Sequence, residues 1–213
     1  MNAQAKICGL TTVETLDAAL DGGAAFIGLV SFPKSPRHLS LDAAATLAQR
    51  ARGRAKVVVV TVDADDALLT EIGLKVRPDL IQLHGREAPD RAHAVRRLTG
   101  AGVIKALPIS GPEDFAVVVD WAPVVDHLMF DARPPKDAIL PGGVGAAFDW
   151  SLLTGRRFER PWFLAGGLTP ENAPKAVRLT GAPLVDVSSG VESAPGVKDA
   201  GRIAAFLEAV RRP

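Results

Sequence analysis

The chain has 213 residues, 47% of them hydrophobic, and carries 25 basic against 24 acidic residues. This length and apolar content suffice for one sizeable core, so we expect a single domain over residues 1–213. The balanced charge, with no long basic or acidic run, excludes a nucleic-acid groove, a polybasic membrane anchor or a solvating tail.

Short β-branched runs alternate with amphipathic stretches along the chain, and the hydrophobic period switches between about 2 and about 3.6 residues. The predicted strands are, in chain order, Ala5–Cys8, Phe26–Val30, Lys56–Val62, Leu80–Leu83, Val103–Leu107, His127–Asp131, Trp162–Ala165 and Leu184–Val187. The predicted helices are Thr12–Leu20, Ser40–Arg52, Ala64–Leu74, Ala88–Thr99, Pro112–Trp121, a short one at Phe148–Leu153, Pro170–Leu179 and Gly201–Arg211. Start signals are Ser40 and the Thr169-Pro170 pair, and stop signals are Gly100, Gly155 and Gly181.

The order of these elements predicts the fold class. Strands this apolar are buried on both faces and, because helices link them, must lie parallel. This leaves a closed barrel or an open, flavodoxin-like sheet that serves as an interaction or signalling module. Eight βα units favour the barrel, so the prediction is an α/β, single-domain (β/α)₈ TIM barrel.

Reactive side chains stand at the ends of several predicted strands, where a barrel builds its active site. Alternation along a strand puts Lys6 and Cys8 on one face, and Gln82 and His84 on one face. The same rule points Asp131 into the barrel mouth together with Cys8. An isolated strand cysteine is more often core filler, and an isolated aspartate after a strand is more often a turn or cap. The strand-end position of Cys8 before Gly9 favours its functional interpretation, and for Asp131 the same interpretation rests on parity along its strand together with the family resemblance given below.

Glycine-rich and hydroxyl-rich segments follow the last three predicted strands. They contain Gly142, Gly143 and Gly145; Gly166 and Gly167; and Ser188, Ser189 and Gly190. Any one of them alone would be interpreted as a simple turn. Three at consecutive strand ends predict a phosphate site, because glycine lets backbone N–H groups approach an anion closely.

Several strings in the sequence are shared with a known family. They are Lys6-Ile7-Cys8-Gly9-Leu10-Thr11, Phe26-Ile27-Gly28-Leu29-Val30, Ser35-Pro36-Arg37, Gln82-Leu83-His84-Gly85, Pro141-Gly142-Gly143-Val144-Gly145, Phe148-Asp149-Trp150, Leu164-Ala165-Gly166-Gly167-Leu168, Asn172, Val185-Asp186-Val187-Ser188-Ser189-Gly190-Val191-Glu192 and Gly196-Val197-Lys198-Asp199. In order and spacing, nearly from end to end, the chain resembles the phosphoribosylanthranilate isomerases. The opening and closing strings are specific, whereas a bare double glycine is weak.

The resemblance implies an Amadori rearrangement of N-(5-phosphoribosyl)anthranilate to 1-(o-carboxyphenylamino)-1-deoxyribulose 5-phosphate, without metal or organic cofactor. It implies that Asp131 is the general acid and Cys8 the general base. Arg37 is expected to hold the anthranilate carboxylate, and the glycine-rich loops the phosphate. The further substrate-binding positions are Gln82, His84 and Asp186.

These roles set requirements on the pKa values of two groups. A thiol titrates near ~8.5 and is a useful base around neutrality only if a cation or dipole lowers that value. We expect Lys6 to lower the pKa of Cys8, and Asp186 to pair with Lys6 and weaken the effect. Asp131 must stay protonated, which requires burial or a negative charge nearby.

The sequence departs from the family pattern at two places, and two alternative functions stay open. Val144 replaces the usual Thr or Ser of the family loop, which puts phosphate affinity in doubt, and the segment 132–137 is unusually rich in Pro and charge. A related phosphosugar barrel, such as a ribulose-phosphate epimerase, would share the fold but lacks the Lys-Ile-Cys-Gly start. A catalytically silent phosphate-binding barrel would not need Cys8 and Asp131.

The remaining features concern compartment and partners. Cys8 is the single cysteine, the histidines are scattered, and no window approaches the ~20 apolar residues of a membrane span. The first ten residues lack a signal pattern. We therefore expect a cytoplasmic protein, a monomer or homodimer, that binds a phosphosugar and neither nucleic acid nor membrane.

Overall fold

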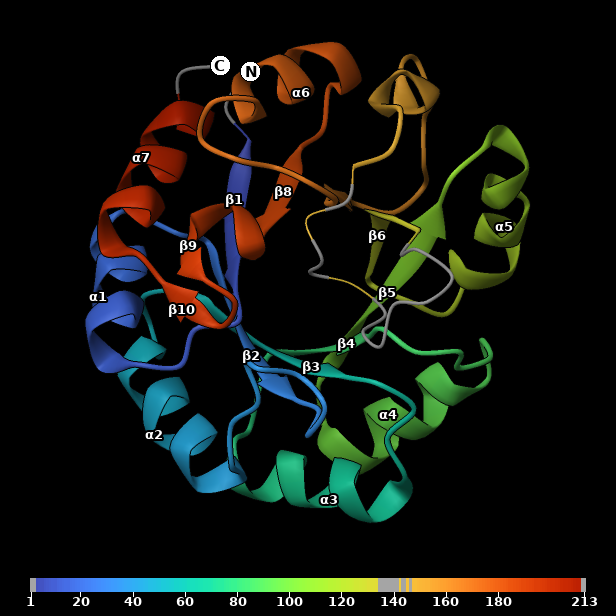
Figure 1. Ribbon diagram of the computed structural model, residues 1–213. Coiled ribbons are helices and arrows are strands. Elements are labelled where there is room, and N and C mark those ends of the chain that lie inside the picture. Colours follow the sequence, from blue (N-terminus) through green and yellow to red (C-terminus); the bar gives the residue numbers. More distant parts are fainter. Residues whose placement is uncertain (1–2, 134–141, 143–144, 146, 212–213) are drawn as a thin grey trace.

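Eight parallel strands close into one barrel in chain order, with β8 hydrogen-bonded to β1 (Figure 1). The computed structural model describes residues 3–133, 142, 145 and 147–211. The barrel strands are β1 (Gln4–Cys8), β2 (Phe26–Ser31), β3 (Lys56–Thr61), β4 (Leu80–Leu83), β5 (Gly102–Ile109), β6 (His127–Ala132), β7 (Trp162–Leu164) and β8 (Leu184–Val187). The predicted fold class is confirmed, and each predicted strand matches an observed one within two residues at either end.

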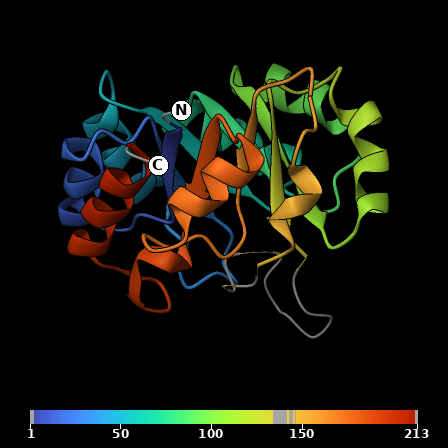
Figure 2. The same ribbon diagram turned by 90° about the horizontal axis from the view of Figure 1, so that it is seen from above.

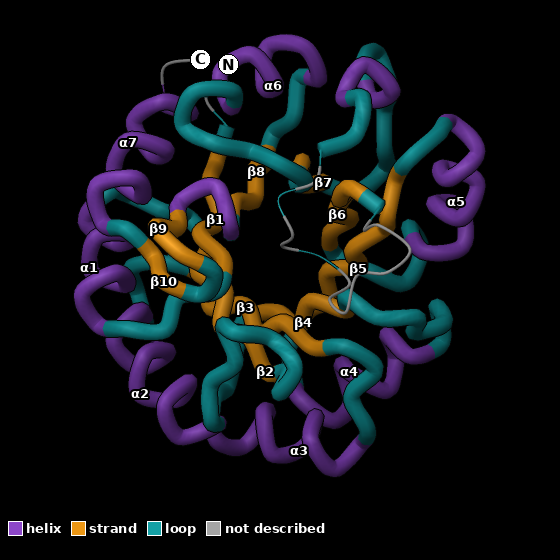
Figure 3. The backbone as a smooth tube through the Cα atoms, viewed as in Figure 1, coloured by secondary structure: helices purple, strands orange, loops and turns teal. Residues whose placement is uncertain are grey.

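The α-helices form a ring outside the strands (Figure 3). The helical elements are α1 (Val13–Asp21), α2 (Leu41–Ala51), α3 (Asp66–Lys75), α4 (Arg91–Thr99), η1 (Pro112–Val117), α5 (Val118–Trp121), η2 (Trp150–Leu153), α6 (Ala173–Thr180), η3 (Ser189–Val191) and α7 (Ala200–Arg211), the η elements being 3₁₀ helices. Among the described helices, none is long and apolar enough to cross a membrane.

Alternation along the strands separates two apolar layers. Ile7, Ile81 and Phe130 point outward and pack beneath the helices, whereas Val58 and Phe163 fill the barrel interior. The inward-facing positions at the carboxyl ends of the strands are therefore left for the site, as the sequence predicts.

Several predicted helices differ from the observed ones in their start or type, and one of them is α4, which begins at Arg91 and not at Ala88. The pair Thr169-Pro170 does not start a helix, because α6 begins at Ala173. The amide of Asn172 accepts from Thr169 N at 2.8 Å and donates to Gly167 O at 2.8 Å, which closes a turn before the helix. The predicted helix at Pro112–Trp121 is a 3₁₀ turn followed by one short α-helical turn. By contrast, Ser40 caps α2 as predicted.

A small antiparallel hairpin, which the sequence did not predict, follows β8. Its strands are β9 (Glu192–Ala194) and β10 (Val197–Lys198). Seen from the side, the hairpin lies at one end of the barrel (Figure 2). Gly196 in its turn has a φ of +82°, and a Cβ there would lie 2.8 Å from Pro36 O. The hairpin therefore packs tightly against the loop that follows β2.

Candidate active site

Two adjoining hollows open at the carboxyl ends of the strands. The first encloses about 520 Å³, including its open mouth, and its lining includes Cys8 and Asp131. The second encloses about 400 Å³ beside the last two barrel strands. Asp131, Gly142, Asp186 and Ser188 line both. The hollows are therefore parts of one site, onto which the predicted acid and base both face.

Cys8 ends β1 and is buried. Its neighbour on β2 is Gly28, where a Cβ would lie 2.9 Å from the Cys8 Sγ, so glycine makes room for the thiol. Burial raises the pKa of Cys8; the charge of Lys6 opposes this rise, Asp186 adds to it, and Lys198 opposes it. The net direction is upward, so the expectation that Lys6 holds the pKa of this thiol below its usual value is wrong.

The predicted pairing of Lys6 with Asp186 is confirmed. The parallel register of β1 and β8 places the two residues side by side, with Lys6 Nζ 2.7 Å from Asp186 Oδ1. The Lys6 side chain is fully buried. Burial favours the neutral amine, but the charges of Asp186 and Cys8 outweigh it, so the pKa of Lys6 is raised above its usual value.

Asp131 is part of a chain of polar contacts across the mouth of the barrel. Its Oδ2 lies 3.3 Å from His84 Nε2, and Gln82 Nε2 lies 3.1 Å from His84 Nδ1. His84 therefore lies between Gln82 and Asp131, with one ring nitrogen toward each. His84 is thus a direct partner of the predicted acid, a role that the sequence did not indicate.

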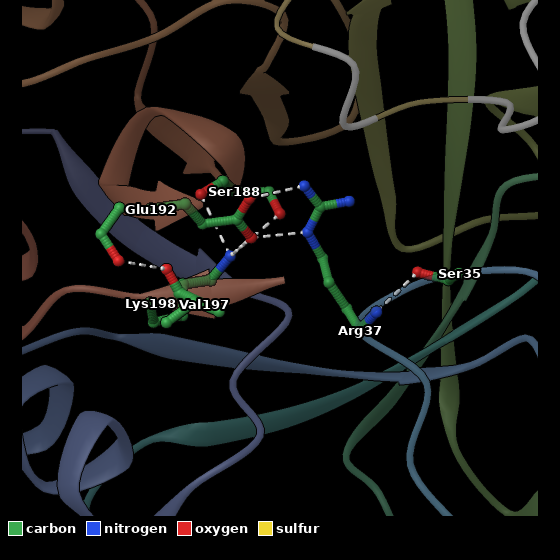
Figure 4. Close-up of polar contacts among 7 residues, drawn as sticks. Ser35, Arg37, Ser188, Glu192, Val197 and Lys198 are labelled. Carbon is green, nitrogen blue, oxygen red and sulfur yellow. Dashed lines mark hydrogen bonds and ion pairs between the residues drawn. The ribbon is translucent and has the colours of Figure 1, made fainter. Parts of the chain in front are cut away.

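Arg37 is held by a carboxylate from the other end of the sequence (Figure 4). Its Nε and Nη2 donate to Glu192 at 2.7 and 2.8 Å, and Lys198 Nζ lies 2.5 Å from the same carboxylate. The sequence assigned no role to Glu192 or Lys198. The only signal was their place within the closing strings of the sequence.

The second hollow contains most of the predicted phosphate-binding positions. Those that line it are Gly142, Gly145, Gly166, Gly167, Ser188 and Ser189. Gly190 does not line it; a Cβ there would lie 1.9 Å from Leu168 O, so this glycine permits close packing beneath the loop. Gly143, together with the Val144 substitution, lies outside the described residues. Within the described ranges, no group of three or more His, Cys, Asp or Glu side chains could hold a metal ion.

Comparisons with known proteins agree with this geometry. Residues 5–209 match the family described as "N-(5'phosphoribosyl)anthranilate (PRA) isomerase". The chain is 56% identical to the N-(5'-phosphoribosyl)anthranilate isomerase of Caulobacter sp. (strain K31), over 98% of this chain and 99% of the relative. A crystal structure of phosphoribosyl anthranilate isomerase in complex with reduced 1-(o-carboxyphenylamino)-1-deoxyribulose 5-phosphate has a TM-score of 0.84 at 30% identity, over 98% of each chain. Monomers generated from the dimeric isomerase of Thermotoga maritima have a TM-score of 0.82 at 29% identity, also over 98% of each chain.

Proposed function

The chain belongs to the N-(5'-phosphoribosyl)anthranilate isomerase family, and we propose that Cys8 and Asp131 are the general base and general acid of its reaction. The enzyme converts N-(5'-phosphoribosyl)anthranilate to 1-(o-carboxyphenylamino)-1-deoxyribulose 5-phosphate in tryptophan biosynthesis. The reaction is an Amadori rearrangement, in which an aldose derivative becomes a ketose derivative within one molecule.

The shared hollow is the observation that carries the assignment. Cys8 on β1 and Asp131 on β6 come from strands separated by β7 and β8 around the ring, and both side chains line the same cavity. A sugar lying between them can therefore meet an acid and a base at different atoms, as general acid–base catalysis requires.

The resemblance to the family implies the following proton transfers. Asp131 protonates the ribose ring oxygen, and the bond between C1 and that oxygen breaks to give an open-chain iminium ion. The Cys8 thiolate then removes the proton from C2, and the electron pair of that C–H bond neutralises the iminium to give an enolamine. Tautomerisation of the enolamine yields the C2 ketone. His84, 3.3 Å from Asp131, orients the carboxyl group.

The two ends of the substrate fit the two hollows. Arg37 lines the first, and its guanidinium suits a carboxylate such as that of anthranilate. The second hollow, with its glycines and the Ser188 and Ser189 hydroxyls, suits the phosphate. Gln82, His84 and Asp186 line the first hollow and would contact the sugar. A relative crystallised with a reduced form of the product supports a phosphosugar substrate of this class.

Three further proposals concern the whole molecule. We propose that residues 1–213 form one domain, because β8 closes the barrel on β1. We propose a monomer or homodimer, since a relative from Thermotoga maritima is described as dimeric. The balanced charge and single cysteine support a cytoplasmic location.

The roles of Cys8 and Asp131 can be tested by replacing each group. Cys8→Ala and Asp131→Asn should each lower kcat by about 10²- to 10⁴-fold, the usual worth of an acid or base, while the circular-dichroism spectrum stays unchanged. Turnover is followed by anthranilate fluorescence after the labile substrate is generated in situ. Asp149→Asn, which alters an exposed cap of η2, is the control. A folded Cys8→Ala enzyme that turns over as fast as wild type would rule out the proposed base.

A further inference from the structure

We propose that Glu192 and Lys198, on the β9–β10 hairpin, are positioning residues that fix Arg37 and Ser188 relative to each other. They would thereby set the spacing between the carboxylate and phosphate subsites. The inference rests on the proposed roles of Arg37 and Ser188 in binding the two ends of the substrate.

The contact between Arg37 and Glu192 fixes the orientation of the guanidinium. Two parallel bonds of 2.7 and 2.8 Å join the Nε edge of the guanidinium to both carboxylate oxygens. The two side chains are only 6% and 5% exposed. A planar fork held at two points in a buried site cannot rotate about its terminal bonds without losing a charge-assisted hydrogen bond. Glu192 therefore determines how Arg37 faces the hollow.

Lys198 connects this pair to the phosphate side of the site. Its fully buried ammonium group lies 2.5 Å from Glu192 Oε1, 3.1 Å from Ser188 O and 3.3 Å from Ser188 Oγ. Ser188 directly follows β8 and lines both hollows. One ammonium group thus holds the first residue of the phosphate loop and the carboxylate that holds Arg37 (Figure 4).

The backbone of the hairpin is fixed to the same loop as Arg37. The turn at Gly196, with its φ of +82°, brings the chain so close to Pro36 that a Cβ would lie 2.8 Å from the Pro36 oxygen. The hairpin therefore meets the loop after β2 at two places, the Glu192 fork and the Gly196 turn.

The charges of the cluster favour an anionic ligand over a purely structural role. Arg37 and Lys198 share one carboxylate, so these three side chains carry a net positive charge when Lys198 is protonated; burial lowers the pKa of Lys198, and the bond to Glu192 opposes this. Burial alone would raise the pKa of Glu192, but hydrogen bonds from Arg37 and Lys198 hold it below its usual value. Buried ion clusters contribute little net stability compared with apolar packing, whereas an excess positive charge beside the site attracts a substrate with two anionic ends.

The test measures separately how the enzyme binds the carboxylate end and the phosphate end of the substrate. Glu192→Gln should raise KM by about tenfold or more, the worth of a charge-assisted hydrogen bond, while kcat changes by less than about threefold. Reduced 1-(o-carboxyphenylamino)-1-deoxyribulose 5-phosphate should inhibit this variant less strongly by the same factor. Ribose 5-phosphate has no carboxylate, so its inhibition constant should stay as in wild type. Lys198→Met should weaken inhibition by both compounds, because it also releases Ser188.

Matched variants keep the outcome interpretable. Asp17→Asn breaks a similar fork, Arg50 with Asp17 at 2.6 and 2.7 Å, but between α1 and α2, and should leave all three constants unchanged. If Glu192→Gln does not fold by thermal melting, Glu192→Asp keeps the charge and shortens the fork, and should raise KM by a smaller factor. A folded Glu192 variant with wild-type KM, beside an Arg37→Ala enzyme with a raised KM, would overturn the inference alone. An unchanged KM in Arg37→Ala would instead overturn the proposed role of Arg37.

Discussion

Replacing Asp186 by asparagine tests how the centre of the barrel tolerates a buried charge. The substitution keeps the shape of the side chain but removes the anion that lies 2.7 Å from the fully buried Lys6 Nζ. Removing one partner of a buried ion pair costs about 3–5 kcal/mol, because the other charge is left uncompensated. At about 2–4 °C per kcal/mol for a chain of this size, the midpoint of thermal unfolding should fall by about 6–20 °C.

The same substitution should reverse the pH dependence of stability in alkaline solution. In the wild type the pKa of Lys6 in the folded protein is raised above the ordinary lysine pKa of 10.5. The ion pair therefore stabilises the fold fully at pH values below 10.5, and this stabilisation is lost as pH rises through the higher pKa of the folded protein. Without the charge and hydrogen bond of Asp186, burial, the largest influence on Lys6, should lower its pKa below 10.5. Unfolding should then become harder, not easier, as pH rises towards 10.5.

Urea unfolding at several pH values measures both effects. The double variant Lys6→Met with Asp186→Asn should recover most of the lost stability, because neither member of this ion pair is left as an uncompensated charge. Asp21→Asn is the control, since its pair with Arg54 is exposed and should contribute less than about 1 kcal/mol. An Asp186→Asn protein that loses no more stability than Asp21→Asn, with the wild-type sign of pH dependence, would refute the reasoning.

Three further predictions concern the site. Gly142→Ala would place a Cβ 2.6 Å from His84 Nε2 and 2.9 Å from Asp131 Oδ2. The kcat should therefore fall while the melting temperature changes little, and an unchanged kcat would contradict this prediction. Gly190→Ala would place a Cβ 1.9 Å from the Leu168 main-chain oxygen, so the free energy of unfolding, measured by thermal melting, should fall by about 1–3 kcal/mol. A variant as stable as the wild type would contradict the close packing at this position. Burial raises the pKa of Cys8, so the rate at which iodoacetamide modifies this thiol should rise with a pH midpoint above that of free cysteine. A midpoint below that of free cysteine would contradict the raised pKa.

The parts of the fold that follow from local patterns could be predicted. Alternation along a strand depends only on neighbouring residues, and it placed Cys8, His84 and Asp131 correctly in the mouth of the barrel. Capping is equally local, so Ser40 marked the start of α2. The start of α6 was mispredicted, because the side chain of Asn172 closes a turn that competes with the helix.

The contacts that depend on distant parts of the chain could not be predicted in the same way. Arg37 and Glu192 are 155 residues apart, and the hairpin that joins them has strands of three and two residues, too short for a hydrophobic period. No local signal in a single sequence indicates such a pairing. The barrel register did allow the pairing of Lys6 with Asp186 to be predicted, because both lie on strands that must be adjacent once the sheet closes.

The wrong expectation for Cys8 shows what the cations near it accomplish. The sequence indicated a neighbouring lysine but not how much water the fold removes, and burial is the largest influence on this thiol. The charges of Lys6 and Lys198 act against burial, whereas Asp186 acts with it. Arg37, whose charge interacts with that of Cys8, is held beside the thiol by Glu192. In the proposed mechanism a thiolate of raised pKa, once formed, is the stronger base for a carbon-bound proton, and the charges of Lys6 and Lys198 counteract the rise in pKa that burial causes.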